Sequence, residues 1–144
     1  MTQAIFVNIP VTDITRTRKF YEGIGFSINP MFSSDQALAI VISDTIFVMA
    51  LTHDYFANFI TRPVADPART TSALICLTRE DMAWVDAMTE AALKHGGSKP
   101  RPAQDHGFMY SRSFCHPDGN WFEPMWMDTA AAANGPPQTD DAAT

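Results

Sequence analysis

The residue best placed to do chemistry in this sequence is a single carboxylate, Glu123, in an apolar segment near the C-terminus. It lies in W-F-E-P-M-W-M, residues 121–127, directly after the turn sequence H-P-D-G-N. A charge inside an apolar strand is costly unless it has a partner, a ligand or access to water. A carboxylate in such surroundings can have a raised pKa and act as a general base. Glu123 is therefore the candidate catalytic residue.

Alternation of side chains along strands selects the residues that can surround Glu123. Within 121–127 it places Trp121 and Met125 on the same face as the carboxylate. A cavity of aromatic and Met side chains with a few polar groups is typical of small-molecule pockets. The alternative is that these residues fill a core or a dimer interface. The candidate ligand-binding residues are Phe6, Asn8, Phe108, Tyr110, Arg112, Trp121 and Met125.

Arg112 leaves two interpretations open, because alternation does not say which face of strand 108–114 lines the cavity. If its own face does, the guanidinium is the natural partner of Glu123 or a clamp for an anionic ligand. If the other face does, Arg112 is a solvated surface residue.

The histidines and cysteines do not form a pattern that predicts a metal site. A catalytic divalent metal usually needs about three protein ligands and one open position. The 4 histidines, at positions 53, 95, 106 and 116, contain no H-x-H or H-x-x-x-H pair. Cys76 and Cys115 lie in apolar segments and are interpreted as small buried side chains, with a reactive thiol as the alternative. We expect no tightly bound catalytic metal and no other cofactor.

The elements that position these residues are predicted from a strand–helix–strand unit that occurs two times in the sequence. The first unit has a strand at 4–10, a helix capped by Asp13, and strands at 26–32, 37–42 and 45–51. The second has a strand at 72–78, a helix at 79–95, and strands at 108–114 and 121–127. Residues 53–61 are predicted as a short helix or ordered lid, and the proline-bearing segment 61–71 as the linker.

The predicted fold is α+β, with two tandem βαβββ modules that form a cupped mixed sheet with helices on its outer face. The modules span about residues 4–60 and 72–128 of one domain, 1–128, and residues 129–144 are predicted to be a disordered tail. A net charge of −6 argues against nucleic-acid binding, and no apolar run is long enough to span a membrane. The N-terminus lacks signal-peptide features, so a cytoplasmic location is expected.

Two segments carry a resemblance to a known superfamily. N-I-P-V-T-D-I-T-R-T-R-K-F-Y-E-G-I-G-F, together with H-P-D-G-N-W-F-E near the end, is similar to the vicinal oxygen chelate proteins. These include glyoxalase I, bleomycin and fosfomycin resistance proteins and extradiol dioxygenases, and the resemblance covers residues 4–128. It implies a homodimer, and it implies metal-ligand positions at Phe6, Val48, Ser72 and Glu123. Of these four side chains, only Glu123 matches a ligand of the metal-dependent members.

The sequence therefore favours a glyoxalase/bleomycin-resistance-like protein that binds a small amphipathic or aromatic molecule in the cup without a catalytic metal. The alternative is a lyase or isomerase of the glyoxalase type, with Glu123 as general base or metal ligand. An extradiol dioxygenase is the third possibility, and the missing histidines argue against it. One fold hosts several chemistries, so the resemblance does not choose among them.

Overall fold

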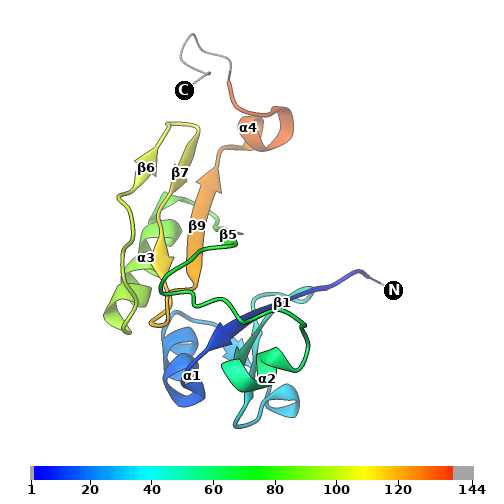
Figure 1. Ribbon diagram of the computed structural model, residues 1–144. Helices are drawn as coiled ribbons and strands as arrows, with labels where there is room; N and C mark the ends of the chain where they lie inside the picture. The colour runs from blue at the N-terminus through cyan, green and yellow to red at the C-terminus, as the bar shows by residue number, and fades with distance from the viewer. Residues whose placement is uncertain (1, 138–144) are drawn as a thin grey trace.

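A computed structural model describes residues 2–137 of the 144-residue chain, and it contains the two predicted modules (Figure 1). The first module comprises β1 (Ile5–Val11), α1 (Ile14–Gly23), β2 (Ser27–Ile28), a 3-10 turn η1 (Pro30–Phe32), β3 (Ala37–Val41) and β4 (Ile46–Thr52). The short helix α2 (His53–Ala57) and an irregular segment lead to the second module. That module comprises β5 (Leu74–Thr78), α3 (Met82–Lys94), β6 (Gln104–Asp105), β7 (Met109–Ser111), β8 (Phe114–Cys115) and β9 (Trp121–Met127), followed by α4 (Thr129–Asn134).

Each module builds its own mixed sheet. The first sheet has the order β1-β4-β3-β2, and the second has the order β5-β9-β7-β6 with β8 also paired to β9. β1 runs parallel to β4 and β5 runs parallel to β9, while the other pairs are antiparallel. The α+β fold with two βαβββ modules is thus confirmed. In place of one cupped sheet there are two, and β1 and β5 are each an edge strand.

The two long helices begin at the residues that their capping side chains select. Asp13 accepts a hydrogen bond from the backbone N–H of Arg16, and Asp81 does the same for Trp84. Gly25, with a φ of 103°, follows the end of α1 in a conformation that favours glycine. Within residues 2–137, no helix is long and apolar enough to cross a bilayer.

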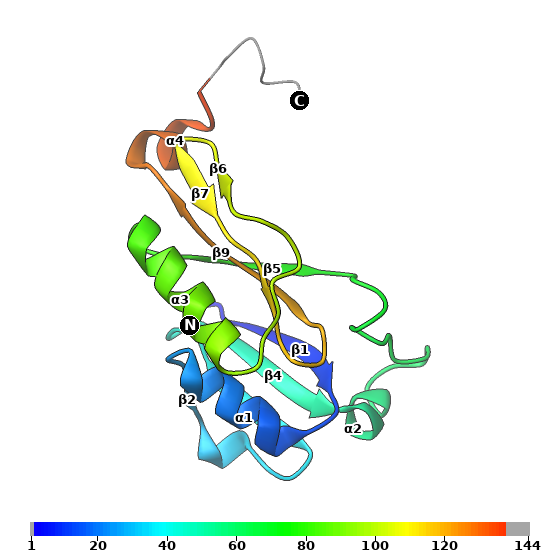
Figure 2. The same cartoon turned by 90° about the vertical axis from the view of Figure 1, so that its left-hand side faces the viewer.

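One apolar core joins the modules. Phe20 and Tyr21 of α1 are fully buried, and the ring of Phe20 lies 6.0 Å from that of Phe114 in β8. Phe114 stacks in turn on Phe122 of β9, at 5.4 Å between ring centroids. α1 and α3 also contact each other, as Figure 2 shows. The buried side chains of the two modules therefore belong to one core cluster.

Three predicted segments differ from the structure, and one of them is the strand expected at 108–114, which is divided into β7 and β8. The strand expected at 26–32 is limited to Ser27–Ile28, because Pro30 begins a 3-10 turn that the Asn29 side chain caps. Residues 129–134, predicted as part of a disordered tail, form helix α4, whose first turn is capped by Asp128. The remainder of that predicted tail, 138–144, lies outside the described residues.

Candidate functional site

The H-P-D-G-N turn, residues 116–120, fastens the second module to the first through Asp118. One oxygen of its carboxylate accepts the backbone N–H of Thr12 at 2.8 Å, and the other accepts the Thr12 hydroxyl at 2.7 Å. Arg16, in the first turn of α1, forms an ion pair with the same carboxylate. Burial alone would raise the pKa of Asp118, but the Thr12 hydrogen bonds and the nearby His116 and Arg16 lower it. The carboxylate is therefore a charged clamp between the modules.

His116 occupies the buried side of the same turn, at 1% exposure. Its Nδ1 accepts the backbone N–H of Asp118 at 3.0 Å, so Nε2 carries the proton and donates to the Thr17 hydroxyl at 2.9 Å. Burial lowers the pKa of His116 to about 4, against the raising effect of Asp118. The imidazole is thus neutral at ordinary pH and ties the turn to α1 by a second, uncharged bond.

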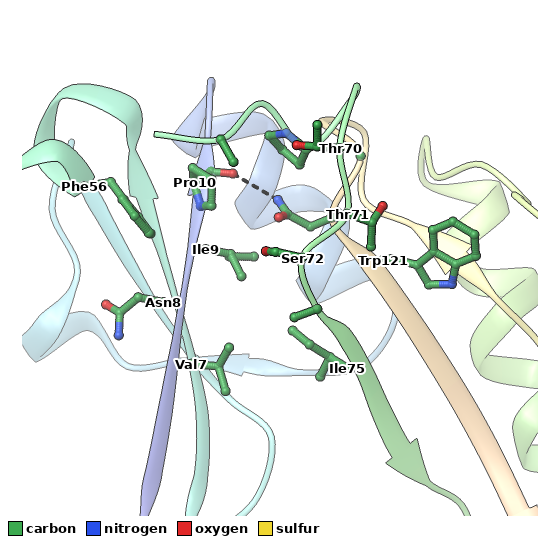
Figure 3. Close-up of a pocket in the computed structure, with 15 residues that line it drawn as sticks. Val7, Asn8, Ile9, Pro10, Phe56, Thr70, Thr71, Ser72, Ile75 and Trp121 are labelled. Carbon is green, nitrogen blue, oxygen red and sulfur yellow. Dashed lines mark hydrogen bonds between the residues drawn. The ribbon is translucent and has the colours of Figure 1, made fainter. Parts of the chain in front are cut away.

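The last two residues of the turn contact the linker and β1. Gly119 has a φ of 109°, and a Cβ on it would lie 2.4 Å from the carbonyl oxygen of Pro67. Only glycine lets the linker backbone approach this closely. The side-chain amide of Asn120 donates to the carbonyl of Pro10 at 3.0 Å (Figure 3). The turn therefore holds α1, β1 and the linker at once.

A cavity of about 270 Å³ lies beside this turn, between β1 and β5. The linker, α2 and the turn complete its walls, with Phe56, Pro67, Thr71 and Asn120 among the residues that line it. Figure 3 shows Val7 and Ile9 of β1 pointing across the gap toward Ile75 and Ser72, with the Ser72 hydroxyl directed at β1. Among the residues described, none that lines the cavity is charged. A small, mostly apolar space with a few polar groups is the usual form of a ligand pocket.

The predicted residues of β1 lie on a face that neither α1 nor α3 covers, although the short helix α2 borders it. Phe6 is 58% exposed, and its ring stacks on that of Phe47 in β4 at 4.6 Å. Asn8 is exposed, and Figure 3 shows its side chain on the far side of β1 from Ile9 and Ser72. A second hollow, of about 370 Å³, lies on this face and includes Asn8 and Phe59 in its walls. Phe59 is 65% exposed, which leaves that hollow open to solvent.

Glu123 lies on the uncovered face of the second sheet. Its register partner on β5 is Cys76, and the Cys76 thiol donates to the carboxylate over 3.9 Å. Burial, then the charge and hydrogen bond of Glu123, raise the pKa of this thiol. Trp121 and Met125 share the face by alternation, as predicted, and are half-buried. Of these, only Trp121 also lines the inter-module cavity.

The structure corrects the predicted positions of Tyr110 and Arg112 in segment 108–114. The hydroxyl of Tyr110 donates to Asp86 of α3 at 2.7 Å, and Arg112 pairs with Asp86 and Glu90 at 3.2 and 2.8 Å. Tyr110 and Arg112 therefore lie on the helix-covered face, opposite Glu123. Arg112 is neither a partner of Glu123 nor a solvated residue, because its side chain is only 12% exposed against α3.

Phe108, two residues before Tyr110, accepts the backbone N–H of Asp128 through its carbonyl, and its ring lies 6.2 Å from that of His106. It is not among the residues that line the inter-module cavity. The strand-108–114 residues therefore do not join the rest of the predicted ligand site.

The positions that the resemblance assigned to metal ligands do not come together as a metal site. Val48 is 1% exposed and belongs to the core, whereas Phe6 lies on the uncovered face and Ser72 in the linker cavity. In the described part of the chain, no three His, Cys, Asp or Glu side chains are grouped to hold an ion. The residues present do not fit the family metal. That the protein binds none stays a prediction.

Several residues of the cavity were not predicted from the sequence. Ser72 was considered only as a position lacking a metal ligand, and Thr71 and Pro67 only as parts of a linker. The sequence feature that could have drawn attention to this region is the turn H-P-D-G-N, because its glycine favours a backbone conformation with positive φ. The contact between Gly119 and Pro67 joins segments about fifty residues apart, and no local sequence pattern predicts such a contact.

Comparisons with known proteins support the fold. Residues 3–38 match a family model described as bleomycin resistance protein-like N-terminal. No curated protein matches the chain significantly. Among solved structures, a hypothetical protein from S. aureus has 21% identity and a TM-score of 0.74 over 88% of this chain and 94% of its own.

Two further structures carry functional descriptions of their own. A glyoxalase-related enzyme from Fulvimarina pelagi has 19% identity and a TM-score of 0.72, covering 88% of both chains. The fosfomycin resistance protein FosX from Mesorhizobium loti has 18% identity and a TM-score of 0.66, covering 92% of this chain and 99% of its own. The resemblance seen in the sequence is thereby confirmed at the level of the fold, which this chain shares with solved proteins described as glyoxalase, bleomycin resistance and dioxygenase family proteins.

Proposed function

We propose that this protein binds a small amphipathic or aromatic molecule, without a catalytic metal, in the cavity between its two modules. The observation that carries the proposal is the construction of the cavity by the H-P-D-G-N turn. Gly119 and Asn120 of the turn line it, while Asp118 and His116 hold the turn against α1. A wall fixed by a charged clamp on one side and two strands on the other is pre-organised, which lowers the entropy cost of binding.

The site's chemistry is that of binding rather than bond-breaking. Its polar groups are hydroxyls and amides, such as Ser72, Thr71 and Asn120, which titrate outside the physiological range. Glu123, the candidate base, lies outside this cavity. A lyase or isomerase that uses Glu123 stays the alternative, and it would have to operate on the uncovered face beside Cys76.

Thermal stability in the presence of ligands tests the proposal. A ligand that binds only the folded chain stabilises it, so a library of aromatic and amphipathic compounds should contain members that raise Tm. Ser72→Phe would fill the gap and should abolish the shifts. The matched control is Ser27→Phe, at an exposed position of β2. If no compound shifts Tm, or if Ser72→Phe retains the shifts, the proposed site is wrong.

We also propose that the protein forms a homodimer through its uncovered sheet faces. Phe6 of β1 is 58% exposed on the uncovered face of the first sheet, and Leu74 of β5 is 50% exposed on that of the second. Large exposed apolar side chains on sheet faces favour association with another surface. Light scattering should give the mass of a dimer, and Phe6→Glu should yield monomers. The control Trp84→Glu, on α3, should leave the dimer intact.

A further inference from the structure

The cavity between the modules is bordered by the free edges of two strands. β1 and β5 each end their sheet's strand order, so each has one side without a neighbouring strand in that sheet. In Figure 3 the two strands diverge around the gap that Ile9 and Ser72 enter. An edge strand carries a row of backbone donors and acceptors that are ready to pair with another group.

The register shows which backbone groups of β1 point into the gap. In a parallel pair, alternate residues direct both N–H and C=O to the same neighbour. The N–H of Ile5 donates to Thr45, next to β4, so Ile5, Val7 and Ile9 face β4. Asn8 and Pro10 therefore face the open edge, which agrees with the bond from Asn120 to the Pro10 carbonyl. Asn8 presents an N–H and a C=O side by side.

The lining then limits the charge of a ligand. No described residue around the cavity carries a charge, so an ionised group placed there would lose hydration without gaining a counter-ion. Apolar contact is available from Val7, Ile9 and Ile75, and the Ser72 hydroxyl faces the strand edge (Figure 3). A neutral group with a donor and an acceptor side by side would satisfy both the edge and the hydroxyl.

We infer that the ligand of this cavity is an uncharged, flat molecule with a carboxamide- or lactam-type edge, which pairs with the backbone of Asn8 as a neighbouring strand would. This inference rests on the proposed function, because it specifies the ligand of the same cavity. Backbone pairing of this kind supplies affinity in β-strand addition to sheet edges. The adjacent side chains supply the apolar contact.

Four matched probes test the ligand class: naphthalene-2-carboxamide, its N,N-dimethyl derivative, naphthalene-2-carboxylate and the corresponding amidinium. They share one naphthalene ring system and differ in charge and in the amide N–H. Titration followed by amide NMR shifts should give the carboxamide a Kd at least about tenfold lower than each of the others. The shifts should centre on Asn8, Ser72 and Ile75.

Two substitutions at one position separate the backbone from the side chain. Asn8→Ala removes a side chain that points away from the gap but keeps the N–H, so the carboxamide should bind within about twofold of the original Kd. Asn8→Pro also lacks the amide side chain, but relative to Asn8→Ala it removes the outward-facing N–H, a loss that an edge strand tolerates, and it should weaken the carboxamide by about tenfold or more. If Asn8→Pro does not fold, Ser72→Ala replaces it, with the same direction of change expected.

The outcomes distinguish this inference from the proposed function. If the charged or dimethylated probes bind the gap as tightly as the carboxamide, the ligand class is wrong while the binding site stands. If Asn8→Ala abolishes carboxamide binding, the contact is made by the side chain and the backbone pairing is wrong. If none of the four probes shifts residues around the gap and no library compound raises Tm, both proposals fail.

Discussion

The turn 116–120 and the strand face that follows it are adjacent in sequence but differ in how their polar groups are satisfied. In the turn, Asp118 has Thr12 and Arg16 as partners, and His116 has Thr17. On the strand face, Glu123 contacts one thiol, over 3.9 Å. Partners in the turn come from the other module, whereas the Glu123 contact stays within one sheet. The turn therefore determines how the modules pack, while the face around Glu123 is free to change without affecting the fold.

Removing the Asp118 carboxylate should have the largest effect, because it breaks the charged clamp. Asp118→Ala leaves the Thr12 N–H and the Arg16 guanidinium without their acceptor, and we expect unfolding free energy to fall by about 3 kcal/mol. Urea denaturation measures the loss. Asp105→Ala, at an exposed carboxylate of β6 that accepts the backbone N–H of Gly107, should cost less than about 1 kcal/mol. Equal losses in the two variants would remove the distinction between clamp and surface.

The second effect is the pH dependence that His116 gives to stability. Its pKa is about 4 in the folded chain and about 6.5 unfolded, so the unfolded state binds a proton first as pH falls. Stability is therefore fully present above about pH 6.5 and is lost progressively down to about pH 4, by about 3 kcal/mol. Asp118, whose pKa is also lowered, adds a loss of the same sign at the acid end.

Denaturation at several pH values checks this dependence. His116→Gln can keep a donor toward Thr17 without a titrating ring, and its stability should change less between pH 6.5 and 4.5. His106→Gln, at an exposed histidine, should retain the full dependence of the parent chain. A parent chain with flat stability across this window would show that the imidazole is not held neutral by burial.

Gly119→Ala should cost about 2 kcal/mol, because a Cβ would meet the Pro67 carbonyl in a conformation that already disfavours alanine. Gly107→Ala provides the control for conformation alone. Gly107 also has a positive φ, of 80°, but a Cβ there would meet nothing within 4 Å, and about 1 kcal/mol is expected. The difference in unfolding free energy between the two variants measures the contact with the linker. No difference would mean that the linker does not rest on the turn.

The capping residues and the repeated unit could be read from the sequence because they depend on local chemistry. Asp13 begins a helix through a bond to a residue three positions on, and the face that Glu123 shares with Met125 follows from alternation. The sheet face on which Arg112 lies could not be predicted from the sequence, because alternation defines two faces without saying which one a helix covers. That choice depends on the register of β7, in which Ser111 pairs with Met125.

Contacts across the chain were the other part that the sequence could not supply. H-P-D-G-N predicts a turn, but nothing in its composition says that Asp118 binds Thr12 or that Gly119 lies against Pro67. Those contacts depend on how α1 packs on β8, through Phe20 and Phe114. The position of the cavity depends on the same packing and could not be predicted from the sequence. Two of its residues, Asn8 and Trp121, were nevertheless among the candidate ligand-binding residues.

The smallest effect on stability is expected at Glu123, where the reactivity of the neighbouring Cys76 thiol reports on the carboxylate instead. Glu123→Gln should change unfolding free energy by less than about 0.5 kcal/mol, since the carboxylate contacts little. It removes the charge that helps to raise the pKa of Cys76, although the effect of burial remains. More thiolate is then present at pH 8, and alkylation of Cys76 by iodoacetamide should accelerate about threefold. Glu22→Gln, on the exposed side of α1, should leave the rate unchanged. An unchanged rate in Glu123→Gln would show that the carboxylate does not face the thiol, and a large loss of stability would show that this face is as constrained as the turn.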